Sequence, residues 1–192
     1  RSTALSTGTN VLQWMVSNGV CAPNTSSMAL VVDNLAMTSI AGPNQTVCVS
    51  SIAMLAANTP TSGTANWSVV SGNASITDAT LATTTASNFA VGATILEWTI
   101  TNGACLSSST MSVQGDDIPD PATTGPDQML CANSPSTILS AASLTIGTGS
   151  WSVVTGSGTI AAPQSPTSSI TALATGTNIL QWTISNGVCA PN

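Results

Sequence analysis

The side chains that could carry chemistry in this 192-residue chain are five cysteines and seven carboxylates. The chain has no His, and its one basic residue is Arg1. Most acid–base and nucleophilic sites need a His, Lys or Arg to move a proton or activate a nucleophile. The sequence also lacks a phosphate-binding loop, a dinucleotide-binding fingerprint and a nucleophile elbow. We therefore predict that the chain is not an enzyme.

Several of the carboxylates fall in one stretch, QGDDIPDPATTGPDQ. Because Ca²⁺ takes several carboxylate oxygens, Asp116, Asp117 and Asp120 form a weak candidate calcium site. The corresponding earlier stretch, VVDNLAMTSIAGPNQ, offers only Asp33 and Asn34. A calcium site common to both stretches would keep its acids in both. We therefore favour a solvated linker stiffened by proline over a calcium site, and we expect no cofactor.

The cysteines recur at a fixed spacing. Cys21, Cys105 and Cys189 are each 84 residues apart, and Cys48 and Cys131 are 83 residues apart. Five cysteines in a chain with few charges are typical of an exported protein that forms disulfides. A metal site is disfavoured because the chain has no His and no CxxC motif.

Two disulfide schemes fit this spacing. In the favoured scheme, Cys48–Cys105 and Cys131–Cys189 close loops within a folding unit, and Cys21 pairs with a cysteine upstream. Each such loop, of about 57 residues, would stabilise its unit by roughly 4 kcal/mol. In the other scheme, Cys21–Cys48 and Cys105–Cys131 cross the unit boundaries, and Cys189 pairs downstream.

The cysteine spacing belongs to a longer internal repeat. Residues 8–24 and 176–192 are identical at 14 of 17 positions, and residues 63–105 match 147–189 at 19 of 43 positions. Such self-similarity at a fixed period is typical of tandem repeat architectures. The repeat length is about 84 residues.

This period divides the chain into three expected segments. We predict the C-terminal part of a truncated repeat over residues 1–34 and a repeat over residues 35–117. A further repeat, truncated before its last strand, is expected over residues 118–192.

Short strands must position these residues. NVLQWMV, TILEWTI and NILQWTI alternate with period two, and each runs into Asn-Gly, a strong hairpin signal. About six or seven such strands per repeat, without a helical period, predict an all-β chain of tandem immunoglobulin-like β-sandwiches. Because Trp buries a large area, we expect all five to lie in cores: Trp14, Trp67, Trp98, Trp151 and Trp182.

Composition limits the partners of the chain. A net charge of −6 with one basic residue lacks the electrostatic footprint of a nucleic-acid binder or a basic membrane-surface patch. No run of 18 apolar residues occurs, so we expect no transmembrane segment. With 42% hydrophobic residues, the chain can bury enough surface to fold.

A recurrent frame runs through the chain. AGPNQTVC (41–48) and TGPDQMLC (124–131) precede G-x-x-x-WSVV-x-G and then G-x-x-IL-x-W-x-I-x-NG-x-C. The frame resembles the Ig-like, PKD-related tandem repeats of giant Bacteroidetes surface proteins associated with gliding motility and type IX secretion. The resemblance covers essentially the whole chain. It implies sandwiches strung into an extracellular stalk or fibre at the cell surface.

Three functions remain open. The first is a structural segment of a long extracellular fibre, whose partners are neighbouring repeats. The second is an adhesive module that binds glycans or a surface, and the third is a filament subunit assembled by strand exchange. The loops are rich in Ser, Thr, Gly, Ala and Asn rather than in aromatic or charged residues, which favours the first.

Overall fold

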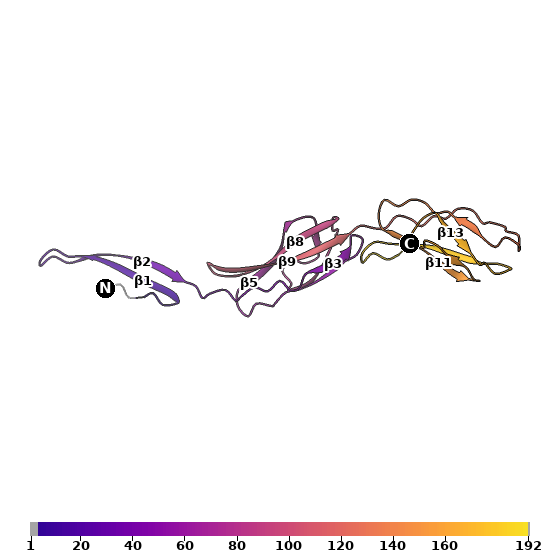
Figure 1. Ribbon diagram of the computed structural model, residues 1–192. Helices are drawn as coiled ribbons and strands as arrows, with labels where there is room; N and C mark the ends of the chain where they lie inside the picture. The colour runs from indigo at the N-terminus through magenta and orange to yellow at the C-terminus, as the bar shows by residue number, and fades with distance from the viewer. Residues whose placement is uncertain (1–3, 192) are drawn as a thin grey trace.

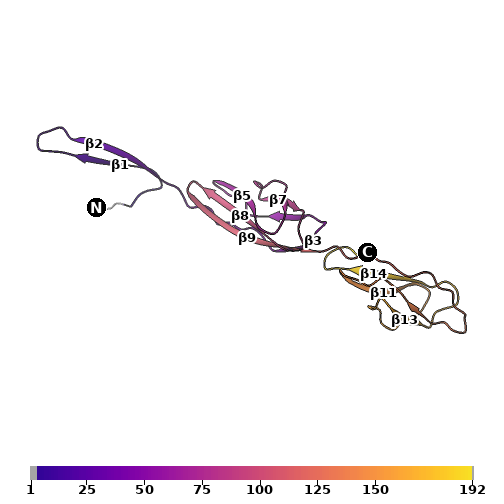
Figure 2. The same cartoon turned by 90° about the horizontal axis from the view of Figure 1, so that it is seen from above.

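The structure is a computed structural model that describes residues 4–191. All regular secondary structure among these residues is β-strand, and none of them forms an apolar helix that could cross a bilayer. Figures 1 and 2 show an elongated arrangement of three parts. We call them the N-terminal hairpin (residues 8–32), the middle body (35–117) and the C-terminal body (118–191).

The N-terminal hairpin consists of two strands that pair only with each other. β1 (Gly8–Val16) and β2 (Asn24–Val32) form an antiparallel ladder along their full length. Trp14 on β1 is 74% exposed, so the prediction that it lies in a core is wrong. Its alternating pattern defines an apolar face, but the described residues provide no second sheet to cover that face.

The middle body contains two sheets. The larger sheet has the order β3-β9-β8-β5, in which β3 and β9 are parallel, and the smaller has the order β4-β7-β6. The strands are β3 (Gln45–Cys48), β4 (Ala53–Ala56), β5 (Thr64–Ser71), β6 (Ser75–Ile76), β7 (Thr83–Ser87), β8 (Gly92–Asn102) and β9 (Cys105–Asp116).

Both sheets contribute to one buried cluster. Trp67 on β5 pairs across the ladder with Trp98 on β8, and their ring centroids lie 5.2 Å apart. Leu55 on β4 is buried in the same cluster, as are Met111 and Val113 on β9. Alternate residues of β8 and β9 face this cluster, as expected for strands with one covered face.

The C-terminal body repeats much of this arrangement. Its sheets have the orders β11-β14 and β10-β13-β12. Trp151 and Trp182 pair across β11 and β14 with ring centroids again 5.2 Å apart. The strands are β10 (Thr137–Leu139), β11 (Thr148–Thr155), β12 (Thr159–Ile160), β13 (Ser168–Thr171) and β14 (Ile179–Ser185).

The two bodies differ at one edge. In the middle body, β9 lies between β3 and β8. Among the described residues of the C-terminal body, no strand occupies the corresponding edge of β14. The counterpart of β3, residues 128–131, has no ladder partner there and is not a strand. The C-terminal body is therefore open where the middle body is closed.

Candidate functional site

A disulfide holds the joint between the middle body and the C-terminal body. Cys48, at the end of β3, is bonded to Cys189, which follows the turn after β14. Their Cα atoms lie 4.8 Å apart, although the two residues are 141 positions apart in the sequence. Both cysteines are buried. The bond thus ties the first strand of one body to the last turn of the next.

This pairing differs from both predicted schemes. The favoured pairs Cys48–Cys105 and Cys131–Cys189 are wrong, and so is the alternative pair Cys21–Cys48. Cys21, Cys105 and Cys131 are free in the structure, so the Cys105–Cys131 pair is not formed within the chain either.

The direction of β3 explains the error. β3 runs parallel to the last part of β9, and Cys48 lies opposite Asp116. Cys105 starts β9, so it lies a full strand length of about 37 Å from Asp116. Cys48 is therefore placed where the chain leaves the middle body, beside the next body's turn and far from its own.

The Asn-Gly turn of the C-terminal body fits against the end of β9. The Val188 N–H donates to Asp116 Oδ2 at 3.0 Å, and Asn186 Nδ2 donates to the Asp117 carbonyl at 2.9 Å. Gly187 has a φ of 53°, and a Cβ there would overlap the Asp116 carboxylate. Only glycine allows this approach without strain.

The same joint is present between the N-terminal hairpin and the middle body. The Ala104 N–H donates to Asp33 Oδ2 at 2.6 Å, and Asn102 Nδ2 donates to the Asn34 carbonyl at 3.2 Å. Gly103 has a φ of 60°, and a Cβ there would overlap the Asp33 carboxylate. Two successive joints therefore use the same turn and the same acceptor.

Cys105 occupies in the first joint the place that Cys189 has in the second. Cys105 Sγ lies 3.9 Å from the Asp33 carbonyl oxygen, and Cys189 Sγ lies 3.3 Å from that of Asp116. The described part of the N-terminal hairpin has no counterpart of β3. No cysteine equivalent to Cys48 is thus available there to Cys105.

The carboxylates of the candidate calcium site are spread along the joint. Among residues 4–191, no group of three or more His, Cys, Asp or Glu side chains is placed to hold a metal ion. Asp116 faces the Asn-Gly turn, whereas Asp120 accepts hydrogen bonds from the N–H groups of Ile146 and Thr145. These N–H groups, Ile146 first, hold the pKa of Asp120 below its usual value.

The role of Asp33 and Asp116 is not recognised from the sequence alone, although a signal exists. The two residues are 83 positions apart, like Cys48 and Cys131, and the Asn-Gly turns that they contact are 84 apart. A shared spacing of acid, turn and cysteine marks a repeated contact between units.

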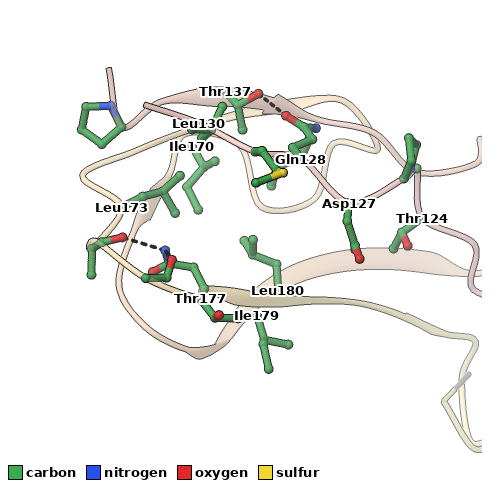
Figure 3. Close-up of a pocket in the computed structure, with 18 of the residues that line it drawn as sticks. Thr124, Asp127, Gln128, Leu130, Thr137, Ile170, Leu173, Thr177, Ile179 and Leu180 are labelled. Carbon is green, nitrogen blue, oxygen red and sulfur yellow. Dashed lines mark hydrogen bonds between the residues drawn. The ribbon is translucent and has the colours of Figure 1, made fainter. Parts of the chain in front are cut away.

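The open edge of the C-terminal body forms a groove of about 680 Å³. It lies between residues 124–132 and residues 173–180 (Figure 3). In the close-up, Gln128 and Leu130 come from the first segment and Ile179 and Leu180 from β14. Its apolar lining comprises Leu130, Leu139, Trp151, Ile170, Leu173 and Leu180.

In the middle body, β9 fills the corresponding space. Met111 lies opposite Leu96 in the β8–β9 ladder, and both are fully buried. Leu180 is the counterpart of Leu96 and is only half-buried. The groove is therefore the place of a missing strand, lined by residues whose counterparts are core.

No known family model matches the chain, and no curated protein matches it. Among solved structures, the chain is similar to the endo-fucoidan hydrolase MfFcnA4_H294Q from glycoside hydrolase family 107, with 8% sequence identity and a TM-score of 0.33. The alignment covers 97% of this chain and 33% of that one, so the chain spans about a third of its length. A likeness at this score supports no conclusion about fold or function.

Proposed function

We propose that this chain is a structural segment of a long extracellular repeat protein, in which tandem immunoglobulin-like sandwiches form a fibre or cell-surface stalk. The observation that carries the proposal is the joint that is built twice with the same parts. Asp33 and Asp116 each accept a hydrogen bond from the Asn-Gly turn of the next unit. A repeated joint gives successive units a repeated orientation, which is what a regular fibre requires.

Covalent bonding supports the same role. The Cys48–Cys189 disulfide links one body to the next instead of closing a single body. Disulfides persist in oxidising environments, which fits an exported protein. A fibre subunit outside the cell benefits from joints that cannot separate when a hydrogen bond breaks.

The filament-subunit alternative is favoured by a specific observation of its own. The N-terminal hairpin pairs with nothing else among the described residues, and the C-terminal body has an open groove. An unused strand and an unfilled strand site in one molecule are the two halves of a strand-exchange contact. No comparable feature of the described residues favours the adhesive alternative.

Immunogold electron microscopy of intact producing cells tests the structural proposal. Antibodies raised against the 192-residue chain should label fibres or stalks outside the cell, and the labelled fibres should shorten or fragment after treatment with a reducing agent. Pre-absorption of the antibody with the purified chain provides the control. Label confined to the cytoplasm of sectioned cells, with none on intact cells, would reject the proposal.

A further inference from the structure

We propose that β2 of a second copy of this chain fills the groove of the C-terminal body, and that Cys131 then forms a disulfide with Cys105 of that second copy. This inference deepens the fibre function proposed above and rests on it. It assigns the groove, the exposed hairpin and two of the free thiols to a single head-to-tail contact.

The side chains of β2 match those that fill the equivalent space in the middle body. In the β8–β9 ladder, Met111 lies opposite Leu96, and in the hairpin Met28 lies opposite Leu12. Two residues further on, Leu30 takes the position of Val113. Met111 and Val113 are buried core residues, whereas Met28 is 57% exposed. β2 therefore carries the apolar pair that the groove lacks, on the correct face.

The ladder that β2 would form with β14 already exists in the hairpin. Residues 8–24, which include β1, and residues 176–192, which include β14, are identical at 14 of 17 positions. β2 would exchange one strand for a nearly identical one and would gain a core to pack against. The exchange costs little because an isolated two-stranded ribbon is only marginally stable in water.

The contact must be between two copies. Figures 1 and 2 place the N-terminal hairpin at one end of the molecule and the C-terminal body at the other, with the middle body between them. The same-chain hairpin therefore lies far from the groove. The Cys48–Cys189 bond anchors the turn after β14, so the incoming strand adds beside β14 and does not replace it.

The second contact follows from the first. In the middle body, β9 places Asp116 opposite Cys48 and delivers the next body's turn, with Cys189, to that cysteine. In the exchanged complex, β2 of the second copy would place its Asp33 opposite Cys131. Its middle body would then follow, and its Cys105 would reach Cys131 as Cys189 reaches Cys48.

Forming this bond requires an oxidant, and a small-molecule disulfide such as oxidised glutathione is sufficient. One thiolate attacks the oxidant's S–S bond, and the second thiolate then displaces the mixed disulfide. One Sγ–Sγ bond forms, the S–S bond of the oxidant breaks, and two small thiols leave with the two electrons and two protons. A heterologous contact of this kind does not close on itself, so it produces an open filament.

The test is non-reducing electrophoresis of the purified 192-residue chain after incubation with oxidised glutathione. We expect a ladder of covalent oligomers, and peptide mapping of the ladder should recover a Cys105–Cys131 link. Cys105→Ser and Cys131→Ser should each remain monomeric alone, but a mixture of the two should form dimers only. Cys21→Ser should leave the ladder unchanged.

A second pair of variants separates strand insertion from simple thiol chemistry. Met28→Asp places a charge on the face that enters the groove, and it should reduce the ladder at least tenfold without unfolding an exposed hairpin. Val31→Asp lies on the opposite face of the same strand, is also exposed in the hairpin, and should leave the ladder intact. Circular dichroism checks that both variants stay folded.

The proposal is overturned by absence of the ladder, by links that involve Cys21, or by a ladder that Met28→Asp does not weaken. These outcomes are separable from failure of the fibre function. Labelled extracellular fibres without a ladder would retain the fibre and discard the exchange. A ladder from a chain that is found only inside cells would do the reverse.

Discussion

The middle body and the C-terminal body are two versions of one sequence pattern, and they differ by one strand. Both pair two Trp residues at the same separation and both end in an Asn-Gly turn. The middle body has β9, and its cluster contains eleven buried residues, whereas the described cluster of the C-terminal body contains five. The comparison teaches that the last strand decides whether this pattern yields a closed core or an open groove.

The two joints form a second comparison. The joint after β9 combines a carboxylate contact with a disulfide, whereas the joint after β2 has the carboxylate contact and an unbonded Cys105. Loss of the same contact should therefore have unequal consequences at the two joints. The following changes test both comparisons.

Removal of the disulfide should have the largest effect on stability. Cys189→Ser opens a loop whose ends are 141 residues apart in the sequence. In the chain-entropy model, a bond of this length lowers the free energy of the folded chain relative to the unfolded chain by about 5 kcal/mol. Differential scanning calorimetry should show the open C-terminal body melting separately, before the middle body. Cys21→Ser is the matched control, and a single unchanged transition in Cys189→Ser would contradict the prediction.

Truncation of the paired Trp residues should cost more in the closed body than in the open one. Trp98→Ala should destabilise the middle body by about 3–5 kcal/mol, the usual cost for a fully buried aromatic residue. Trp182→Ala, at the same place in β14, should cost about 2 kcal/mol less because its cluster is smaller. Denaturant unfolding followed by circular dichroism measures both. Equal costs would mean that the C-terminal body is as well packed as the middle body.

Removal of the joint carboxylates should separate the two joints. Asp33→Ala leaves the Ala104 N–H without its acceptor, and hydrogen exchange at this amide should accelerate at least tenfold. Asp116→Ala removes the equivalent acceptor of Val188, but the adjacent disulfide keeps the turn in place, so the acceleration should be smaller. Hydrogen exchange measured by NMR resolves both amides. A larger acceleration at Val188 would show that the disulfide does not support the joint.

Acid should have the smallest effect, through one carboxylate in each body. Hydrogen bonds from Ile146 and Thr145 lower the pKa of Asp120, and those from Thr80 lower the pKa of Asp78. Because the folded pKa lies below the unfolded value of about 3.9, the stabilisation is complete above that pH. It is lost as the pH falls through the lower, folded value.

Melting temperatures at pH 7 and at about pH 2.5 test this dependence. Asp120→Asn should reduce the acid-induced drop for the C-terminal body alone, and Asp78→Asn should reduce it for the middle body alone. Both effects should be small because exposed carboxylates are well screened by water. An acid-induced drop that neither variant changes would assign it to other groups.

The sequence predicts the strands and turns well because their signals are local. Period-two patterning and the Asn-Gly pairs mark β8, β14 and their turns, and Gly103 and Gly187 have the positive φ that such turns require. Trp14 shows the limit of this reasoning. Alternation shows which face of a strand is apolar, but it does not show whether another sheet covers that face.

The disulfide could not be predicted from the spacing for a different reason. Cys105 and Cys189 occupy the same place in successive repeats, so a periodic pattern cannot tell which of them meets Cys48. The choice depends on the parallel pairing of β3 with the end of β9, which brings together distant parts of the chain. Long-range parallel pairing has little local sequence signature.

The connectivity of Cys48 and Cys189 also determines how the molecule would carry a mechanical load. Tension applied to the two ends of the chain would cross from Cys48 directly to Cys189 through the disulfide. Residues 49–188, which include most of the middle body and nearly all of the C-terminal body, would therefore lie outside the path of the force. At about 3.5 Å per extended residue, roughly 490 Å of chain would stay unavailable for extension until the bond is reduced. Oxidation would thus make the fibre nearly inextensible, and reduction would turn the same chain into a long shock absorber.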